Sequence, residues 1–398
     1  MVRLTARGLG LVTAAVVLLI AAGVTGLRPL AWPAGLLLGL VAASTLLVWL
    51  SARRAWLRRR LSTDRVAAGA SVPVRLDLSR DGIGLGAWGY LEDAVPPGLA
   101  GAPVLPVPSG WGHLETELHY SLGTFLRGRY RIGPCRSTTL DPLGLASSRR
   151  RLGGRNLLTV TPAVHPLGAT TAGAGTGLVG EATQRRSSVL GPDDALIREY
   201  RPRDELRRIH WPSTAHTGTL MVRREEHAWE PSALILLDNR STGHVGAGPA
   251  SSFEWAVSAA ASVGAHLIDA GYDVTLSETD GRRLTVAGDA TRESLLDHLT
   301  DSTLTDAGDL ADALRSDSGG RAELLIAIIG RLSRADALAL TTLRRHGALC
   351  RAILLQPTEP DPDDPADILL ANGWRVVRDA AAGGIPQAWT ALADEVPR

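Results

Sequence analysis

The sequence predicts two N-terminal transmembrane helices, then a small β-sandwich-like domain and then an α/β domain. Three observations support this order: two uncharged apolar segments open the chain, short alternating runs follow, and the carboxy-terminal half alternates strands with helices. The expected boundaries are a helical hairpin over residues 1–60, a β-rich domain over 61–164, a flexible linker over 165–192 and the α/β domain over 193–398. A chain of 398 residues has room for two or three domains.

The composition indicates the cellular compartment of the protein but gives little information on its function. The net charge is +1, so charge gives no indication of a nucleic-acid partner, and none is expected. All basic residues are arginines, which is typical of coding bias in a GC-rich genome. The two cysteines, Cys135 and Cys350, lie far apart and form no CxxC pattern. They suit a reducing compartment and predict neither a disulfide framework nor a zinc site.

The two apolar segments are expected to cross a lipid bilayer. Residues 9–27 carry no charge, and residues 30–50 repeat this pattern after the short break Arg28-Pro29. Each is about as long as the ~20 residues that a helix needs to span the hydrocarbon core, and a helix satisfies its own backbone in lipid. The short break makes the helices antiparallel. The alternative, a cleaved signal peptide, is disfavoured because a second apolar segment and a basic cluster follow at once.

The placement of arginines predicts the orientation of the hairpin. Arg3 and Arg7 precede the first helix, and Arg28 alone lies in the turn. Five arginines follow the second helix: Arg53, Arg54, Arg58, Arg59 and Arg60. The positive-inside rule then places both ends in the cytoplasm. We therefore expect a multi-pass protein of the cell membrane whose soluble part is cytoplasmic.

Residues 65–162 have the pattern of a β domain. Residues 71–78 and 113–122 alternate apolar and polar side chains, and residues 157–161 read as a last short strand. Several short strands at this spacing favour a small sandwich or barrel. The three arginines at 149–151 are interpreted as a solvated hairpin tip, with lipid head-group contact as the alternative.

Residues 165–192 are rich in Gly, Ala, Thr and Ser and have no apolar period, which predicts a flexible connector. Residues 175–180 read Gly-Thr-Gly-Leu-Val-Gly and satisfy GxGxxG. A dinucleotide site needs a hydrophobic strand before this motif. None precedes it here, so no nucleotide binding is expected.

Residues 197–238 concentrate arginines, carboxylates and aromatic side chains. Pro202 disfavours helix at the residue before it, and Asp204 can cap a short helix that runs through Trp211. A short strand is expected over 220–222 and a buried strand over 233–238. An ion-pair network between domains can form from Arg198, Glu199, Arg201, Asp204 and Arg207.

The order of residues in this stretch resembles the DUF58 family, bacterial proteins of unknown biochemical function. The resemblance rests on Arg198, Glu199, Tyr200, Arg201, Pro202, Asp204, Arg207, Ile209, Trp211 and Arg223, followed by the apolar strand that ends in Asp238. Residues 127–134 (Arg-Gly-Arg-Tyr-Arg-Ile-Gly-Pro), residues 141–145 (Asp-Pro-Leu-Gly-Leu) and the membrane hairpin also look like this family. The chain departs from the family pattern at Arg203, His210, Pro212 and His216, which argues against a catalytic role.

This resemblance implies association with a MoxR-type AAA ATPase and with a transglutaminase-like membrane protein. It also implies a carboxy-terminal domain similar to von Willebrand factor A, which is a Rossmann-type fold. Independently, the apolar runs at 234–237 and 324–329 alternate with helical segments and predict a doubly wound, mostly parallel sheet. The binding crevice of such a sheet lies outside the carboxyl ends of its strands, which places Asp238 there.

A von Willebrand A domain holds Mg²⁺ through Asp-x-Ser-x-Ser on the loop that follows its first strand, because a hard cation prefers oxygen ligands. Here residues 238–242 read Asp-Asn-Arg-Ser-Thr. Asp238 and Thr242 match, but Arg240 replaces the first serine, and Gly330-Arg331 stand where a second acidic ligand is expected. The expectation is a degenerate magnesium site and no other cofactor.

The leading hypothesis is a membrane-anchored scaffold or adaptor that acts through a MoxR-type AAA ATPase and makes no bonds itself. The alternative is a metal-dependent enzyme that uses Asp238 with His210, His216, Glu225 and His227. These histidines lack HExxH spacing. A hydrolase triad built on Ser213 is disfavoured because no GxSxG elbow is present.

Overall fold

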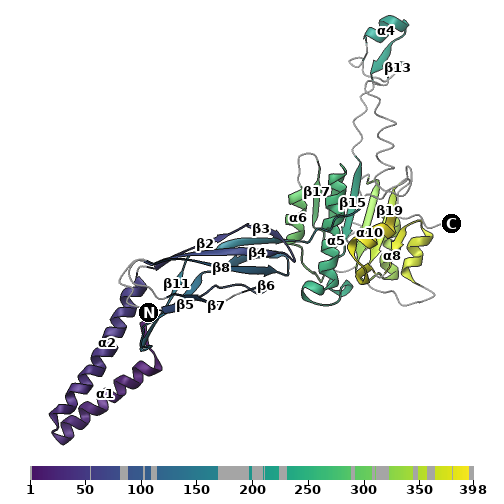
Figure 1. The fold of residues 1–398 in the computed structure, drawn as a ribbon. Helices are drawn as coiled ribbons and strands as arrows, with labels where there is room; N and C mark the ends of the chain where they lie inside the picture. Colours follow the sequence, from purple (N-terminus) through teal and green to yellow (C-terminus); the bar gives the residue numbers. More distant parts are fainter. Residues whose placement is uncertain are drawn as a thin grey trace. The chain divides into compact units, whose positions relative to one another are not determined.

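The computed structural model describes residues 2–53, 55–80, 88–101, 104–108, 114–168, 197–199, 209, 211–223, 231–287, 292–306, 310, 322–343, 348–355, 364–378 and 380–393. The chain divides into two compact units, residues 1–161 and 162–398 (Figure 1). The first unit contains a helical hairpin and a β-rich body, and the second contains a mixed sheet flanked by helices.

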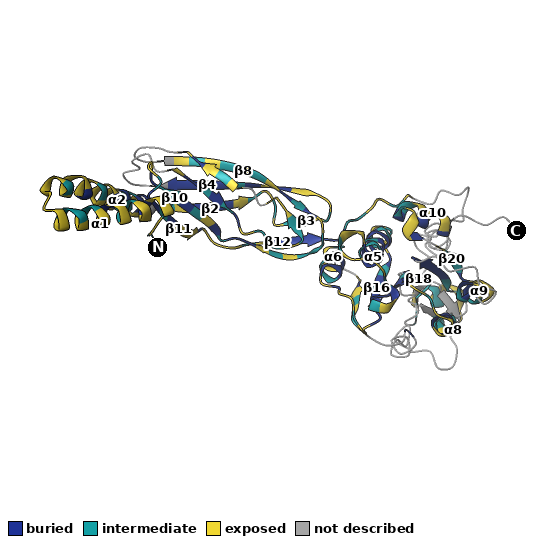
Figure 2. Cartoon of the chain, turned by 90° about the horizontal axis from the view of Figure 1, so that it is seen from below, coloured by how far each residue is buried: buried dark blue, intermediate teal, exposed yellow. Residues whose placement is uncertain are grey.

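The hairpin consists of α1 (Ala6–Thr25), the 3-10 turn η1 (Arg28–Leu30) and α2 (Ala31–Arg53). Thr5 caps α1 by accepting a hydrogen bond from the Gly8 amide at 3.2 Å. Both helices are long and apolar enough to cross a membrane by length and composition. Most of their side chains are exposed (Figure 2), as expected of helices whose solvent is lipid. The two predicted helices are confirmed.

A strand that the sequence analysis did not predict precedes the hairpin. β1 (Val2–Leu4) pairs antiparallel with β11 (Ala146–Leu152), with Leu4 opposite Ala146. After the hairpin, β2 (Ala55–Leu61) pairs with β4 (Ser71–Arg80), so residues 55–60, which were expected in the hairpin domain, belong to the β-rich body. Both ends of the hairpin therefore join one β-rich body.

The β-rich body contains three sheets. Their strand orders are β1-β11-β10-β5-β7, β2-β4-β8-β6 and β3-β12-β9. The remaining strands are β3 (Arg65–Ala67), β5 (Trp88–Glu92), β6 (Leu99–Ala100), β7 (Val104–Val107), β8 (Leu114–Thr124), β9 (Gly128–Ile132), β10 (Cys135–Leu140) and β12 (Asn156–Thr161). The strands expected near 71–78, 113–122 and 157–161 are confirmed as β4, β8 and β12.

Apolar side chains that alternate along the strands form a hydrophobic core in the β-rich body. Val72, Val74 and Leu76 point inward from β4 and pack with Leu122 of β8 and Leu158 of β12. The prediction of a hairpin tip at 149–151 was wrong, because these arginines are exposed in the middle of β11 and pair with residues 136–138 of β10.

A buried ion pair lies within this core. Arg59 donates to Asp93 through Nε at 2.8 Å and Nη2 at 2.5 Å, and the Tyr120 hydroxyl donates to the same carboxylate at 2.5 Å. The exposed fractions of the Arg59 and Asp93 side chains are 1% and 0%. A Cβ at Gly133 would lie 2.5 Å from Arg59 Nη1, and the φ of Gly133 is +92°, so only glycine suits this position. This contact gives a physical reason for the glycine in the 127–134 motif.

The second unit is built on a six-stranded sheet of order β17-β16-β15-β18-β19-β20, in which only β17 is antiparallel. Its strands are β15 (Ser232–Leu237), β16 (Asp273–Glu278), β17 (Arg283–Val286), β18 (Leu324–Ile329), β19 (Leu349–Leu354) and β20 (Arg375–Val377). The described helices that follow β15 are α5 (Ser252–Asp269), α6 (Arg292–Thr300), α8 (Arg334–Leu343), α9 (Pro365–Ala371) and α10 (Ile385–Ala393).

Helices cover both faces of this sheet. Ile235 and Leu237 of β15 pack on one face with α5 and α10, whereas Leu234 and Leu236 pack on the other with α8 and α9. Strands buried on both faces must be apolar throughout, which is why β15 and β18 read as unbroken runs. The predicted alternation of strand and helix is confirmed. Only residues 165–168 of the expected linker belong to the described residues. Residues 169–192, which include the GxGxxG motif, lie outside them.

Candidate functional site

The predicted signature residues are described only in part. Arg198 and Glu199 lie in β13 (Ile197–Glu199), which pairs antiparallel with β14 (Met221–Arg223), so Arg223 is opposite Ile197. Ile209 is half-buried, and Trp211, the first residue of α4 (Trp211–Thr217), is 66% exposed. The rest of the signature lies outside the described residues: Tyr200, Arg201, Pro202, Asp204 and Arg207. The proposed ion-pair network among these side chains therefore stays a prediction.

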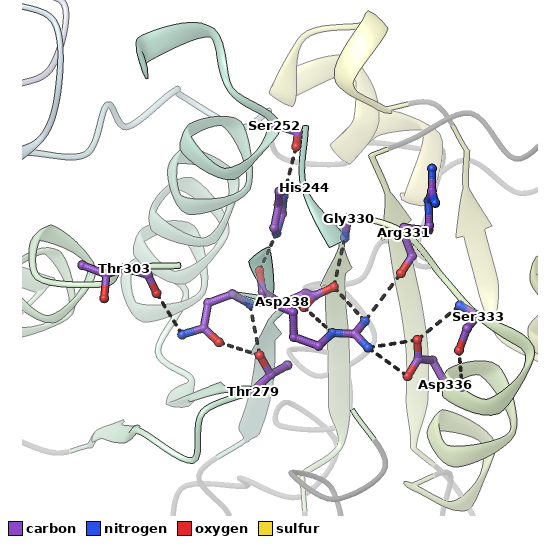
Figure 3. A network of polar contacts seen from close by, with 11 residues as sticks. Asp238, His244, Ser252, Thr279, Thr303, Gly330, Arg331, Ser333 and Asp336 are labelled. Atoms are coloured by element: carbon purple, nitrogen blue, oxygen red, sulfur yellow. Dashed lines mark hydrogen bonds and ion pairs between the residues drawn. The ribbon is translucent and has the colours of Figure 1, made fainter. Parts of the chain in front are cut away.

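The best-defined polar site lies at the carboxyl edge of the parallel sheet (Figure 3). Asp238 follows β15 directly, and its side chain is fully buried. Its Oδ1 accepts from Arg240 Nε at 2.8 Å and from the Arg240 amide at 3.1 Å, while Oδ2 accepts from Arg240 Nη2 at 3.0 Å. The amide of Gly330, at the end of β18, lies 3.4 Å from Oδ2. Both oxygens of the expected metal ligand are thus engaged by N–H groups.

A second carboxylate completes the site from a helix. Arg240 Nη1 donates to both oxygens of Asp336, each at 3.1 Å. Asp336 lies in the first turn of α8, where its carboxylate accepts from the Ser333 amide at 3.2 Å and its own amide donates to Ser333 Oγ at 3.1 Å. This is a reciprocal cap of the helix start. Sequence reasoning missed Asp336 because it looked for an acid directly after β18; the Ser-x-x-Asp pattern was the available signal.

The three side chains form one buried charged group, which we call the Arg240 bridge: Asp238, Arg240 and Asp336. Their exposed side-chain fractions are 0%, 8% and 4%. Burial by itself lowers the pKa of Arg240, but the hydrogen bonds and negative charges of Asp238 and Asp336 outweigh it and raise the pKa above its ordinary value. The guanidinium therefore stays charged between the two carboxylates.

The residues at this edge do not fit the magnesium ion that the von Willebrand A resemblance implies. Mg²⁺ requires about six oxygen ligands in a near-octahedral arrangement. Arg240 fills both oxygens of Asp238, and Thr242, in the 3-10 turn η3 (Ser241–Gly243), is exposed. Within the described part of the chain, no group of three or more His, Cys, Asp or Glu side chains could hold a metal.

A second polar cluster lies beside the bridge. Glu278, at the end of β16, accepts from Asn239 Nδ2 at 3.0 Å and from Ser302 Oγ at 2.7 Å, and it lies 2.8 Å from His298 Nε2. Thr279 Oγ1 donates to Asn239 Oδ1 at 2.5 Å. The Ser302 hydroxyl therefore ties the loop after α6 to the carboxylate at the end of β16.

His244 fixes the loop that carries Asp238. Its Nε2 donates to the Asp238 carbonyl at 2.7 Å, its Nδ1 lies 3.1 Å from Ser252 Oγ, and its ring meets Phe253 edge-on at 5.2 Å. Burial lowers the pKa of His244 below its ordinary value of 6.5. The ring is therefore neutral at pH 7 and acts as a structural hydrogen-bonding group. Of the other residues proposed as metal ligands with Asp238, His216 is exposed on α4, and His210, Glu225 and His227 lie outside the described residues.

His244 should make the second unit less stable in mild acid. In the unfolded chain its pKa is near 6.5, so between this value and its lower folded-state pKa the unfolded state binds more protons. The free energy of unfolding must then fall as the pH decreases below about 6.5. Denaturant titrations of the full chain at several pH values should show a shallower dependence for His244→Gln than for the parent or for His119→Gln, an exposed control on β8. Identical slopes for His244→Gln and the parent would contradict the assignment.

Two of the three residues of the bridge lie within a segment that matches a known family. Residues 196–323 match the model of the family described as Protein of unknown function DUF58. This segment runs from β13 through β15 to α6 and includes Asp238 and Arg240, whereas Asp336 lies beyond it. The resemblance noted from the sequence is therefore confirmed for the DUF58 segment, which covers less than half of the chain.

Other comparisons add no functional information. No curated protein matches the chain. A conjugative transposon lipoprotein from Bacteroides eggerthii DSM 20697 is 12% identical, with a TM-score of 0.17, over 26% of this chain and 100% of that one. The sporulation control protein Spo0M from Bacillus subtilis is 12% identical, with a TM-score of 0.14, over 37% of this chain and 58% of that one. A β-glucuronidase of glycoside hydrolase family 2 is 8% identical, with a TM-score of 0.15, over 81% of this chain and 27% of that one. The chain spans 58% of the length of the second of these proteins and 27% of the length of the third.

Proposed function

We propose that this protein is a membrane-anchored scaffold or adaptor whose α/β unit docks a protein partner without a metal ion. The observation that carries this proposal is the Arg240 bridge, in which a guanidinium stands where a divalent cation would bind Asp238. A site saturated by its own side chains has no open ligand position for a substrate or an activated water. The proposal includes no bond-making step and no magnesium.

The hairpin supplies the anchor in this proposal. Two helices of 20 and 23 residues leave and re-enter one β-rich body, as a membrane hairpin requires. The excess of arginine at both ends favours a cytoplasmic location for the soluble units. The proposal also includes a β-sandwich-like fold for the first unit and a von Willebrand A-like fold for the second.

The partner favoured by the DUF58 resemblance is a MoxR-type AAA ATPase, with a transglutaminase-like membrane protein as a further component. An exposed tryptophan is a typical anchor of a protein interface, and Trp211 of α4 is such a residue within the DUF58 segment. We propose that α4 contributes to the docking surface.

Partner capture tests the adaptor role. The full chain in detergent should retain a MoxR-type ATPase from the same cell. Trp211→Ala should weaken binding by about 30-fold or more, since truncating a central aromatic residue costs at least ~2 kcal/mol. Leu370→Ala is the matched control, because Leu370 is an exposed apolar residue of α9 outside the DUF58 segment. Failure of the parent chain to capture the ATPase would argue against the proposal.

Metal analysis separates the adaptor from the metal-dependent enzyme that would use Asp238 with His210, His216, Glu225 and His227. We expect the purified full chain to carry no stoichiometric divalent ion and to unfold at the same temperature with Mg²⁺ as with a chelator. In Arg240→Ser two buried carboxylates lose their cation, so added Mg²⁺ should raise the unfolding temperature of this variant by mass action. One tightly bound ion that is lost in Asp238→Ala would instead support the enzyme.

A further inference from the structure

The end of the β-rich body that adjoins the hairpin carries exposed apolar side chains. Leu143, in the turn between β10 and β11, is 51% exposed, and Trp88, the first residue of β5, is 48% exposed. Trp88 pairs with Leu140, the last residue of β10, and Leu143 lies in the turn that follows. Trp88 and Leu143 therefore lie at the same end of this sheet. We call residues 141–145 together with Trp88 the foot of the β-rich body.

The turn of the foot is attached to the first turn of α1. The Thr5 amide donates to the Leu145 carbonyl at 2.9 Å, and Thr5 Oγ1 donates to the Gly144 carbonyl at 2.6 Å. A Cβ at Gly8 would lie 2.2 Å from the Leu145 carbonyl oxygen, so helix and turn approach as closely as a glycine allows.

Asp141 holds the turn in shape. Its buried carboxylate accepts from the Leu143 amide at 3.0 Å and from the Ala146 amide at 2.7 Å. This gives a physical reason for the Asp-Pro-Leu-Gly-Leu motif: the aspartate fixes a turn that seats the hairpin and presents Leu143 outward. Leu143 therefore has a defined position beside the start of α1.

Helix length sets the depth of the foot. α1 has 20 residues. At ~1.5 Å per residue its length matches the ~30 Å thickness of the hydrocarbon core, so no turn of the helix is left over outside the core. If α1 spans the bilayer, its first turn lies at the boundary between hydrocarbon and headgroups. A turn bonded to Thr5 must lie at the same depth.

We propose that the foot enters the headgroup layer of the bilayer that holds the hairpin, with Leu143 at the acyl boundary and Trp88 among the headgroups. Indole rings prefer this layer. The Arg7 guanidinium lies beside the turn, with Nη1 3.7 Å from a Cβ built at Gly144, where it can pair with a lipid phosphate. This inference rests on the proposed membrane anchoring and adds a second lipid contact, made by the β-rich body itself.

Site-directed fluorescence tests the depth of the foot. Leu143→Cys and Trp88→Cys variants of the full chain, labelled with an environment-sensitive fluorophore and reconstituted into phosphatidylcholine liposomes, would be exposed to lipids that carry a nitroxide quencher. The native Cys135 and Cys350 are buried, and burial raises the pKa of the Cys135 thiol to about 12, so neither should react at neutral pH.

Two further positions serve as controls. Val17→Cys reports on α1, where Val17 is 63% exposed. Phe125→Cys reports on a side chain that is 55% exposed and directly follows β8. The opposite end of β8 is the end near the hairpin, because Leu114 pairs with Arg80, and Arg80 pairs with Ala55 just after α2. The 11 residues of β8 separate the two ends by about 35 Å.

We expect lipid nitroxides to remove most of the emission at positions 143, 88 and 17 and to leave position 125 unchanged. Quenching at 17 without quenching at 143 and 88 would overturn the foot while leaving membrane anchoring intact. A blue-shifted label at 143 that lipid nitroxides do not quench would indicate protein cover and would also overturn it. Absence of quenching at 17 would refute the anchoring itself, and the foot with it.

Discussion

Replacing Arg240 by methionine is expected to lower the free energy of unfolding of the second unit by about 3–5 kcal/mol, because removal of one partner leaves a buried charge without compensation. Here two carboxylates, Asp238 and Asp336, would lose their shared guanidinium in a site where no side chain is more than 8% exposed. The unit would also lose the link between the end of β15 and the start of α8. Chemical denaturation of the full chain, with hydrogen exchange read on peptides from β15 and α8, measures the loss.

The matched control for this variant is Arg378→Met. Arg378 also bridges two carboxylates, Asp364 and Asp367, but its side chain is 43% exposed. Exposed pairs contribute at most about 1 kcal/mol because water screens them and side-chain entropy opposes them. Equal losses from Arg240→Met and Arg378→Met would show that the bridge is not a buried electrostatic unit.

Replacing Arg59 by methionine should destabilise the first unit by a similar amount, about 3–5 kcal/mol. Asp93 would remain fully buried without its guanidinium partner, although the Tyr120 hydroxyl would still donate to it, and the carbonyls of Ile132 and Gly154 would lose their bonds to Arg59 Nη1. Hydrogen exchange should show loss of protection across β2, β4 and β8, with the second unit unaffected.

Arg60→Met provides the comparison within the same strand. Arg60 pairs with Asp77 at 3.0 Å, but its side chain is 55% exposed, so its removal should cost less than about 1 kcal/mol. If Arg59→Met were as mild as Arg60→Met, the buried ion pair would not be the polar centre of the β-rich body.

Local pattern was sufficient to predict most elements of the protein. Two uncharged runs of helical length became α1 and α2, the alternation at 71–78 became β4, and the unbroken apolar run at 324–329 became β18. Each of these signals lies within a few turns or one strand, and each reports which faces of the element are buried. The position of Asp238 at the carboxyl edge followed from the same reading, because an acid that ends a parallel strand lies at that edge.

Contacts between distant residues could not be read in this way. β1 has three residues, too few for a period, and forms only because β11 offers an edge more than 140 positions later. Arg240 looked like a defect in a metal loop, and Asp336 was not considered, because 96 positions separate them and nothing local shows that a helix brings them together.

The sequence by itself determined that this chain carries a membrane-length hairpin, a β-rich body and a parallel α/β unit with an acid at its edge, since burial patterns are encoded locally. Only the tertiary structure decided which charges meet there. An ion pair forms where folding removes water from both partners at once, and that depends on the packing of β15 against α8, not on the order of residues in either.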